Sequence, residues 1–526
     1  MFYRASLQAA AVLASFSLLA GCGLLSDGES KTEQKIVVGT TSEPSTLDPA
    51  AAWDNSWELM RNVFQTLVSF PTGSTKPEPD AAEWCKFTDT TSTAYRCKLR
   101  EGLKFSNGDK LDAEAVKYSI DRITDLKVKG GPLGMLGSLD RVETTGDDIV
   151  VFHLTKPDAT FPFILATPAM SLVAPSAYSK HKVRSDGLVT GSGPYLLDSY
   201  KPGNRAELVK NPEYKGFANR KNDAVTIRYF KESAPVVAAL KAKEIDAIYR
   251  GLTAEDVVSL EDNKDKDSDL QIVENVGADI RFLVFNPEDP AAGNVAVRRA
   301  IAQLVDRDAL VAKVYQGTAE PLYSMVPKGI GGHTTSFFDA YGDPDKGKAK
   351  QILAKAGITE PVSLTFWFTT DRYGSSTAPE FDELKRQLEA SGLFKITLRS
   401  KPWKEFQEGF NKGQYPVFGR GWFPDFPDPD NFIAPFVGKE SVTGMPYIKK
   451  EITDQLLPQT RKESDRAAVT KQFERAQKIL VDDVRLLPLW QGKLYVAAGE
   501  DIGGGERALD PQTVMQMWEL YRKASW

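Results

Sequence analysis

The chain has 526 residues, more than one hydrophobic core usually spans, so we expect two or three domains. Its hydrophobic fraction of 41% and its charged fraction of 26% are ordinary for a soluble globular protein. A formal net charge of −5 supplies no general basic surface for a phosphate backbone, so the composition gives no reason to expect nucleic-acid binding.

The N-terminal segment has the layout of an export signal. Arg4 precedes an uncharged, mostly apolar run from Ala5 to Ala20, which is shorter than the roughly 20 residues of a membrane span. The run leads into Leu-Ala-Gly-Cys22, which resembles the lipobox of bacterial lipoproteins, where the cysteine is lipidated and becomes the new N-terminus. We predict a signal peptide over residues 1–21 and a lipidated Cys22 with a flexible tether over residues 22–35. The alternative is a plain signal peptide with a chance cysteine.

The other two cysteines are predicted to meet in a hairpin. Cys85 and Cys97 lie in two alternating segments that flank a turn rich in Thr, Ser and Asp. An exported protein favours a disulfide between them, and two free buried thiols are the alternative. A metal site would need more ligands than this pair offers.

The remaining chain predicts alternating strands and helices. Asp112 is placed to cap a helix whose Val116, Ile120 and Ile123 share one face. No internal repeat stands out, so the pattern indicates a mixed α/β protein with several lobes. The predicted strands are 36–40, 148–154, 191–197, 224–230, 245–249, 281–287, 362–368 and 394–400, and the predicted helices are 53–69, 112–123, 233–244, 294–316, 348–356 and 378–391.

Motifs for catalysis, metals and nucleotides are not found. His153, His181 and His333 lie far apart, without metal-ligand spacing around them. The GxxxxGK match at 342–348 is followed by Ala, so it lacks the magnesium-binding hydroxyl, and residues 265–270 lack the glycine of a calcium loop. We therefore expect a protein that is not an enzyme and has no metal or cofactor. A secreted hydrolase of cell-envelope material is the competing class, but no catalytic constellation can be placed.

Residues 421–432, GWFPDFPDPDNF, combine four aromatic residues, three prolines and three aspartates. Proline fixes φ and removes a backbone donor, so the stretch suits neither a helix nor a central strand. A carboxylate held beside a Trp face attracts a cation through its charge, and the ring adds about 0.5–2 kcal/mol. Rigid prolines would lower the entropy cost of that capture. The stretch therefore indicates a binding site for a cationic group.

Seven segments in order resemble one family, the family 5 extracellular solute-binding proteins, which are dipeptide and oligopeptide receptors of ABC importers. They cover nearly all of the chain that follows the tether. The segments are 43–49 (EPSTLDP), 99–123, 191–195 (GSGPY), 239–248, 297–317, 343–357 and 421–432.

The resemblance implies a two-lobed, periplasmic-binding-protein-like α/β fold with an extra domain beside the first lobe. The ligand would lie extended in the cleft between the lobes. The loaded protein, a monomer, would dock on the permease of an ABC importer at the outer or periplasmic face of the cell membrane. The implied divisions are a discontinuous first lobe (36–70, 190–285 and 491–526), an extra domain (71–189) and a second lobe (286–490).

The resemblance also implies which residues bind the ligand. Asp425 takes the position that pairs with the ligand's α-ammonium group, and Trp422 lies beside it. Trp403 matches a pocket aromatic, and Arg372 stands where some members bind the carboxylate of a dipeptide. Trp53, in the loop after TLDP, is a further candidate for the cleft.

Each of these residues has an ordinary structural alternative. Asp425 could be a turn residue, the tryptophans could be core residues, and Arg372 could be a solvated or ion-paired side chain. Asp428 and Asp430 are expected to act only in turns.

The same fold could also bind a different solute. Members of the family carry oligosaccharides, nickel complexes and haem, and Trp platforms suit sugars. The scarcity of histidine disfavours a metal held directly by histidine side chains.

Overall fold

The computed structural model describes residues 34–262 and 269–524. The predicted signal peptide, Cys22 and nearly all of the tether lie outside the described residues, as does most of the rejected calcium loop at 265–270. Within the described ranges, no helix is both long enough and apolar enough to cross a membrane.

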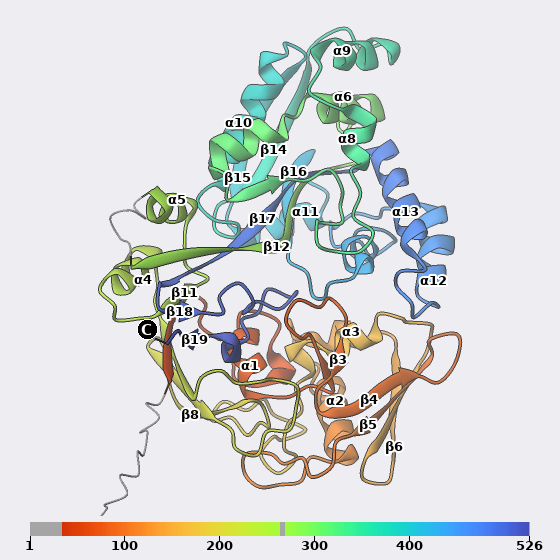
Figure 1. Cartoon of the computed structure of the whole chain (residues 1–526). Helices are drawn as coiled ribbons and strands as arrows, with labels where there is room; N and C mark the ends of the chain where they lie inside the picture. The colour runs from red at the N-terminus through yellow and green to blue at the C-terminus, as the bar shows by residue number, and fades with distance from the viewer. Residues whose placement is uncertain (1–33, 263–268, 525–526) are drawn as a thin grey trace, which may run out of the picture. The chain divides into compact units, whose positions relative to one another are not determined.

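The chain from Gln34 onward packs as one compact unit around an 11-stranded mixed sheet (Figure 1). The strand order is β15-β14-β16-β12-β17-β11-β1-β10-β9-β8, and β13 also pairs with β17. The strands are β1 (Lys35–Thr40), β8 (Tyr195–Lys201), β9 (Arg205–Lys210), β10 (Ala224–Tyr229), β11 (Ala247–Tyr249), β12 (Leu270–Phe285), β13 (Ala319–Pro321), β14 (Val362–Thr369), β15 (Phe394–Lys401), β16 (Val417–Trp422) and β17 (Leu486–Gly499).

Two long antiparallel strands, β12 and β17, run through both halves of this sheet. We call the side with β1 and β8–β11 the first lobe, and the side with β13–β16 the second lobe. The pairing of β12 with β17 is interrupted between Val276 and Ile280. A Cβ atom on Gly277 would lie 2.2 Å from the carbonyl oxygen of Gly492, so the two backbones approach as only glycine allows.

The residues between the first segments of the first lobe form a second, antiparallel sheet of four strands in the order β4-β5-β7-β6. Cys85 lies directly opposite Cys97 in this sheet, and the structure joins their Sγ atoms at 2.04 Å. Asp112 caps α2 by accepting a hydrogen bond from the amide of Ala115. The elements are β4 (Ala82–Phe87), β5 (Ala94–Leu99), β6 (Leu139–Thr145), β7 (Ile149–Leu154), α2 (Ala113–Leu126) and α3 (Phe161–Leu165).

This extra region does not have a separate hydrophobic core. Phe152 of β7 and Ile120 of α2 belong to the same buried cluster as Val38 of β1 and Trp518 near the C-terminus. The extra region is therefore fused to the first lobe by shared packing.

Helices cover both faces of the second-lobe sheet (Figure 1). One buried cluster joins α6, α9 and α10 to β14 and β15, and another joins α11 and α13 to β12 and β16. The helices are α6 (Val295–Leu304), α9 (Lys346–Lys355), α10 (Thr377–Ala390), α11 (Trp403–Asn411) and α13 (Thr470–Asp483). The other α-helices and strands of the described chain are shorter: α1 (Trp57–Val63), α4 (Ser233–Lys241), α5 (Ala254–Asp262), α7 (Arg307–Leu310), α8 (Ser336–Tyr341), α12 (Leu457–Thr460), β2 (Val68–Ser69), β3 (Glu78–Pro79), β18 (Ile502–Gly503) and β19 (Tyr521–Arg522).

Two predicted helices differ from the structure. The helix expected over 53–69 is only α1, because Phe64 takes an extended backbone (φ −118°, ψ 160°) and the chain then pairs as β2. The helix expected over 294–316 breaks at Val305, and Asp306 caps the short α7 that follows. In both segments the apolar spacing marks burial correctly, but burial at that spacing does not require one continuous helix.

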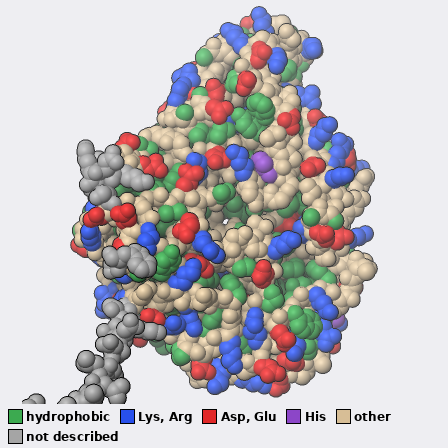
Figure 2. Space-filling model, in the orientation of Figure 1, with side chains coloured by type: hydrophobic (Ala, Val, Ile, Leu, Met, Phe, Trp, Pro, Cys, Tyr) green, Lys and Arg blue, Asp and Glu red, His purple; other side chains and the backbone are tan. Residues whose placement is uncertain are grey.

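Figure 2 shows lysine and arginine side chains interspersed with acidic ones over the face in view. No field of a single sign covers that face, in keeping with the composition.

Candidate ligand-binding cleft

Four of the five predicted binding residues follow the carboxyl ends of parallel strands, and the fifth, Trp422, is the last residue of β16. In the second lobe, β14 is parallel to β15 and β16, and the segments after these strands carry Arg372, Asp425 and Trp403, which is the first residue of α11. In the first lobe, β1 is parallel to β10 and β11, and the loop after β1 carries Trp53. Ligands of open α/β sheets bind at the carboxyl ends of the strands. The topology therefore brings the predicted residues to the edges where a ligand site is expected.

Asp425 holds its carboxylate at the meeting point of the two lobes. Its Oδ1 atom accepts a hydrogen bond of 2.8 Å from the Trp53 indole, and its Oδ2 atom accepts one of 3.2 Å from the Asn431 amide. The side-chain amide of Gln512 also donates to its carbonyl oxygen. Burial raises the pKa of the Asp425 carboxyl, and the bonds from Trp53 and Asn431 lower it in part. Among the described residues, no lysine, arginine or histidine forms an ion pair with it.

Trp53 is 42% exposed and therefore is not a core residue. The helix predicted to contain it begins only at Trp57, so Trp53 lies in the preceding loop. The hydrogen bond from its indole to Asp425 joins two residues that are 372 positions apart in the sequence. The structure thus places Trp53 against Asp425, and its contact with a ligand stays a prediction.

Trp422 supports Asp425 indirectly, through Asn431. Its indole Nε1 donates to Asn431 Oδ1 at 3.1 Å, and its ring packs edge-on against Phe436 with centroids 5.2 Å apart. Asn431 Oδ1 also accepts from the amide of Asp425 at 3.0 Å. Asn431 therefore orients Asp425, a role that the sequence analysis missed although the residue belongs to the same motif.

Asp428 and Asp430 do more than form turns, so that expectation was incomplete. Asp428 does cap the following turn, accepting from the amide of Asp430 at 2.9 Å. Its carboxylate also binds Arg466 through two hydrogen bonds of 2.7 and 2.9 Å. Asp430 binds Arg461 through two bonds of 2.9 Å each. Both carboxylates are buried, and these two ion pairs fix the motif to the segment that follows α12.

Arg372 and Trp403 lie together at the second-lobe edge. The guanidinium carbon of Arg372 is 5.4 Å from the Trp403 ring centroid and 5.8 Å from that of Phe423. Arg372 is exposed and Trp403 is half-buried, so the pair offers both charge and a partly open ring. Their contact with each other is a finding, whereas their contact with a ligand stays a prediction.

Arg281 on β12 lies against Asp279 and Trp490, and sequence reasoning missed it. It is 7% exposed, and its guanidinium carbon lies 4.5 Å from the Tyr373 ring centroid and 5.0 Å from that of Trp490. Gly421 makes room for it, since a Cβ atom there would lie 2.6 Å from Arg281 Nη1. The Asp279 carboxylate balances its charge, with Oδ2 lying 3.4 Å from Arg281 Nη1.

An open pocket of about 670 Å³ lies beside Asp425. Arg250 and Thr513 line it from the first lobe, while Phe423, Pro424 and Trp490 line it from the second. A pocket with walls from both lobes, apolar rings and a few polar groups is the usual form of a small-ligand site.

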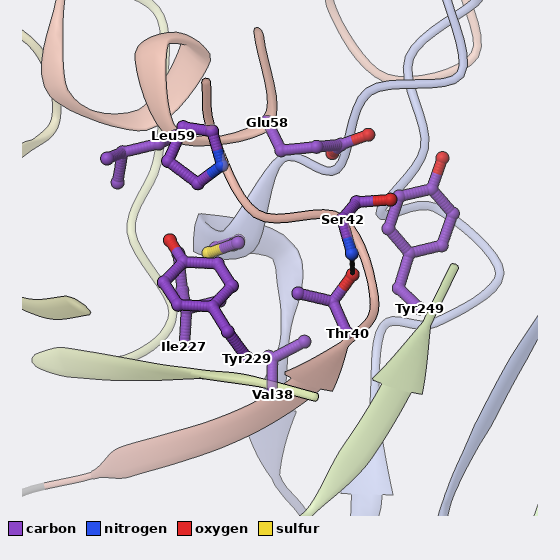
Figure 3. Close-up of a pocket in the computed structure, with 10 residues that line it drawn as sticks. Val38, Thr40, Ser42, Glu58, Leu59, Ile227, Tyr229 and Tyr249 are labelled. Carbon is purple, nitrogen blue, oxygen red and sulfur yellow. Dashed lines mark hydrogen bonds between the residues drawn. The ribbon is translucent and has the colours of Figure 1, made fainter. Parts of the chain in front are cut away.

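A much smaller hollow, nearly filled by its own side chains, lies within the first lobe at the ends of β1, β10 and β11 (Figure 3). Glu58 lines it among mainly apolar side chains, and the amide of Ser42 donates to Thr40 Oγ1 at its edge. Glu58 accepts a hydrogen bond of 2.6 Å from Arg250 Nε. Burial raises the pKa of the Glu58 carboxyl, and Arg250 offsets the rise in part. Arg250, which also lines the pocket beside Asp425, is therefore already paired with Glu58.

The described residues contain no group of three or more His, Cys, Asp or Glu side chains that could hold a metal ion.

The family model for bacterial extracellular solute-binding proteins, family 5 Middle, matches residues 76–444. The chain belongs to this family. It has the mixed α/β, two-lobed fold of periplasmic binding proteins, and its family consists of solute-binding proteins that act outside the cytoplasm.

Relatives of this family 5 protein align along nearly their whole length. The chain is 26% identical to the probable D,D-dipeptide-binding periplasmic protein DdpA of Escherichia coli K12, with 89% of this chain and 90% of the relative covered. It is also 26% identical to heme-binding protein A of Haemophilus influenzae, with 88% of each covered. The solved structure of the unliganded, open periplasmic murein tripeptide-binding protein MppA superposes with a TM-score of 0.80 at 20% identity, covering 93% of this chain and 98% of MppA.

Proposed function

We propose that this family 5 protein captures short peptides in the cleft between its lobes and delivers them to an ABC import permease. The observation that carries the proposal is the partly buried Asp425 carboxylate, which is held by neutral donors and has no cationic partner among the described residues. A buried carboxylate without a cation is costly, and the α-ammonium group of a peptide would supply the missing charge. The ring of Trp53, hydrogen-bonded to the same carboxylate, adds a surface suited to that cation. The dipeptide and tripeptide named for two relatives support this solute class.

The proposal includes how the molecule is built and anchored. The lobes and the extra domain would divide as the sequence predicts, with β12 and β17 passing between the lobes near Gly277 and Gly492. Lipidation at Cys22 would tether a monomer to the outer face of the membrane. The bonded sulfur atoms of Cys85 and Cys97 fit an oxidising compartment.

Isothermal titration of the full chain in detergent tests the role of Asp425. We expect Ala-Ala-Ala with a free amine to bind at least about tenfold more tightly than N-acetyl-Ala-Ala-Ala, because acetylation removes the positive charge. Asp425→Asn should weaken binding of the free peptide and remove the difference between the two peptides. Asp382→Asn, an exposed carboxylate on α10, is the matched control and should behave as wild type.

Two results would refute this role. The first is equal affinity for the free and the acetylated peptide in wild type. The second is an Asp425→Asn variant that still distinguishes them. If no peptide binds but an oligosaccharide or haem does, the fold is used for another solute.

A further inference from the structure

A second open pocket lies at the border between the extra region and the second lobe. Lys156 and Pro157, just after β7, line one side of it, and the other side comes from the chain between Ala434 and Lys462, which follows β16. The pocket is somewhat larger than the one beside Asp425, and none of the five predicted binding residues lines it. It is therefore a candidate site distinct from the cleft.

The wall of this pocket is mainly apolar. Its apolar lining residues are Pro157, Ala434, Val437, Leu457 and Pro458. Val437 and Leu457 also belong to the buried cluster that joins α11 and α13 to β12 and β16, so core packing holds the wall in place. A Cβ atom on Gly438 would meet nothing within 4 Å beyond its chain neighbours, so the backbone there borders open space. The wall thus offers a fixed surface to an apolar chain.

The charged residues that line the pocket are all cations. They are Lys156, Arg461 and Lys462. Asp430 neutralises Arg461 through two hydrogen bonds of 2.9 Å. Lys156 and Lys462 are exposed, and neither forms an ion pair within the described ranges. Two unpaired positive charges beside an apolar wall complement a molecule that has an apolar body and an anionic end.

We propose that this pocket is a second binding site, which takes a small amphiphile made of an apolar chain that ends in one anionic group. The chain lies against Val437 and Leu457, and the anionic group accepts hydrogen bonds from the ammonium groups of Lys156 and Lys462. A carboxylate and a phosphate monoester both supply such a group. The inference goes beyond the proposed function and does not depend on which cargo the cleft binds.

Arg461 connects this pocket to the motif that carries Asp425. Its guanidinium holds Asp430 of that motif, and its carbonyl oxygen accepts a hydrogen bond of 2.9 Å from the amide of Ala159 in the extra region. The next carbonyl, that of Lys462, accepts one of 3.0 Å from Ser92 Oγ. An occupant that touches both walls favours the arrangement in which these bonds are made. Binding in the pocket should therefore rigidify the motif.

Photolabelling tests the location of the site. The full chain in phosphatidylcholine vesicles is irradiated with an octanoate analogue that carries a diazirine in its chain, and the labelled peptides are identified by mass spectrometry. We expect label on residues 156–157 and 434–462. Octanoate should compete, hexanoate should compete about fourfold to sixteenfold more weakly because it lacks two methylene groups, and octylammonium should not compete. Stronger competition by octyl phosphate than by octanoate would assign a phosphate end group, and the reverse would assign a carboxylate.

Three variants separate the charges and the wall of the pocket from the rest of the surface. Lys156→Gln with Lys462→Gln should reduce labelling about threefold to tenfold, because each exposed charge contributes modestly. Lys346→Gln with Lys350→Gln, on α9, is the matched control and should label as wild type, since these lysines are also exposed and without an ion pair within the described ranges. Ala434→Trp fills the pocket and should abolish labelling there. The lysine variants should unfold at the same urea concentration as wild type.

Hydrogen exchange tests the connection to the motif. Octanoate should slow the exchange of the Asp428, Asn431 and Ala159 amides by about threefold or more in wild type and in the control, but not in Lys156→Gln with Lys462→Gln. Label on Trp53 or residues 421–425, or equal labelling of the two lysine variants, would overturn the site. Unchanged exchange in wild type would overturn its connection to the motif. Neither measurement uses a peptide, so failure here leaves the peptide function standing, and a chain that binds no peptide still gives a result.

Discussion

Replacing Asp48 with asparagine should break the buried ion pair that joins the first lobe to the extra region. The Arg122 guanidinium donates to both carboxylate oxygens of Asp48, at 2.7 and 2.6 Å, and the two side chains are 1% and 0% exposed. The amide of Arg184 also donates to Asp48 at 2.7 Å. In the Asp48→Asn variant the side chain would keep one acceptor oxygen but would turn an NH₂ group toward these donors.

The cost follows from what remains in the core. Breaking a buried pair by removing one partner costs about 3–5 kcal/mol, because the remaining charge has no counterion. That loss is large against a total stability of about 5–15 kcal/mol for a typical domain. Since Trp53 lies five residues beyond Asp48 on the same loop, we also expect the indole bond to Asp425 to loosen and peptide affinity to fall.

Urea unfolding of the full chain, followed by circular dichroism, measures this cost. A double variant, Asp48→Leu with Arg122→Met, should lose less than the sum of the two single losses, because it removes both charges and leaves apolar groups. The reasoning is refuted if Asp48→Asn costs less than about 1 kcal/mol, or if the two single losses add in the double variant.

Two further predictions concern the extra region and its border. Burial raises the pKa of Asp80 to about 6, against hydrogen bonds from Tyr214 and Gln65 that lower it, so the folded state holds this proton more tightly than the unfolded state does. The free energy of unfolding should therefore fall by up to about 3 kcal/mol as pH rises from 4 to above 6. Unfolding curves taken at several pH values measure this dependence, and Asp80→Asn should remove this part of it. A variant with the same pH dependence as wild type contradicts this account. Replacing Cys85 and Cys97 by serine opens a link between residues 12 apart and should cost about 3 kcal/mol in the same unfolding assay, with wild type under reducing conditions matching the variant.

Local signals in the sequence account for most elements of the fold. Asp112 was a predictable cap because a helix start is set by residues a few positions apart. The strands at 362–368 and 394–400 were predictable because apolar, β-branched and aromatic residues gather there. The parallel pairing of β14 with β15 and β16 could not be predicted from local signals, since it depends on pairing between distant segments.

The same distinction applies to the site. Asp425 was predicted from its motif, but the motif could not indicate that Trp53 would bind its carboxylate. The ion pair of Asp430 with Arg461 spans 31 positions without any local pattern. Arg281 gave no signal because one arginine in an apolar strand does not reveal which side chains will pack against it.

The path of β12 and β17 through both lobes has a mechanical consequence. Each strand contributes one part to each lobe, so cutting the chain between the lobes would disrupt the sheet and would not yield two independently folded domains. Any rotation of one lobe against the other would have to be absorbed where the pairing lapses after Val276, at the tight crossing of Gly277 and Gly492.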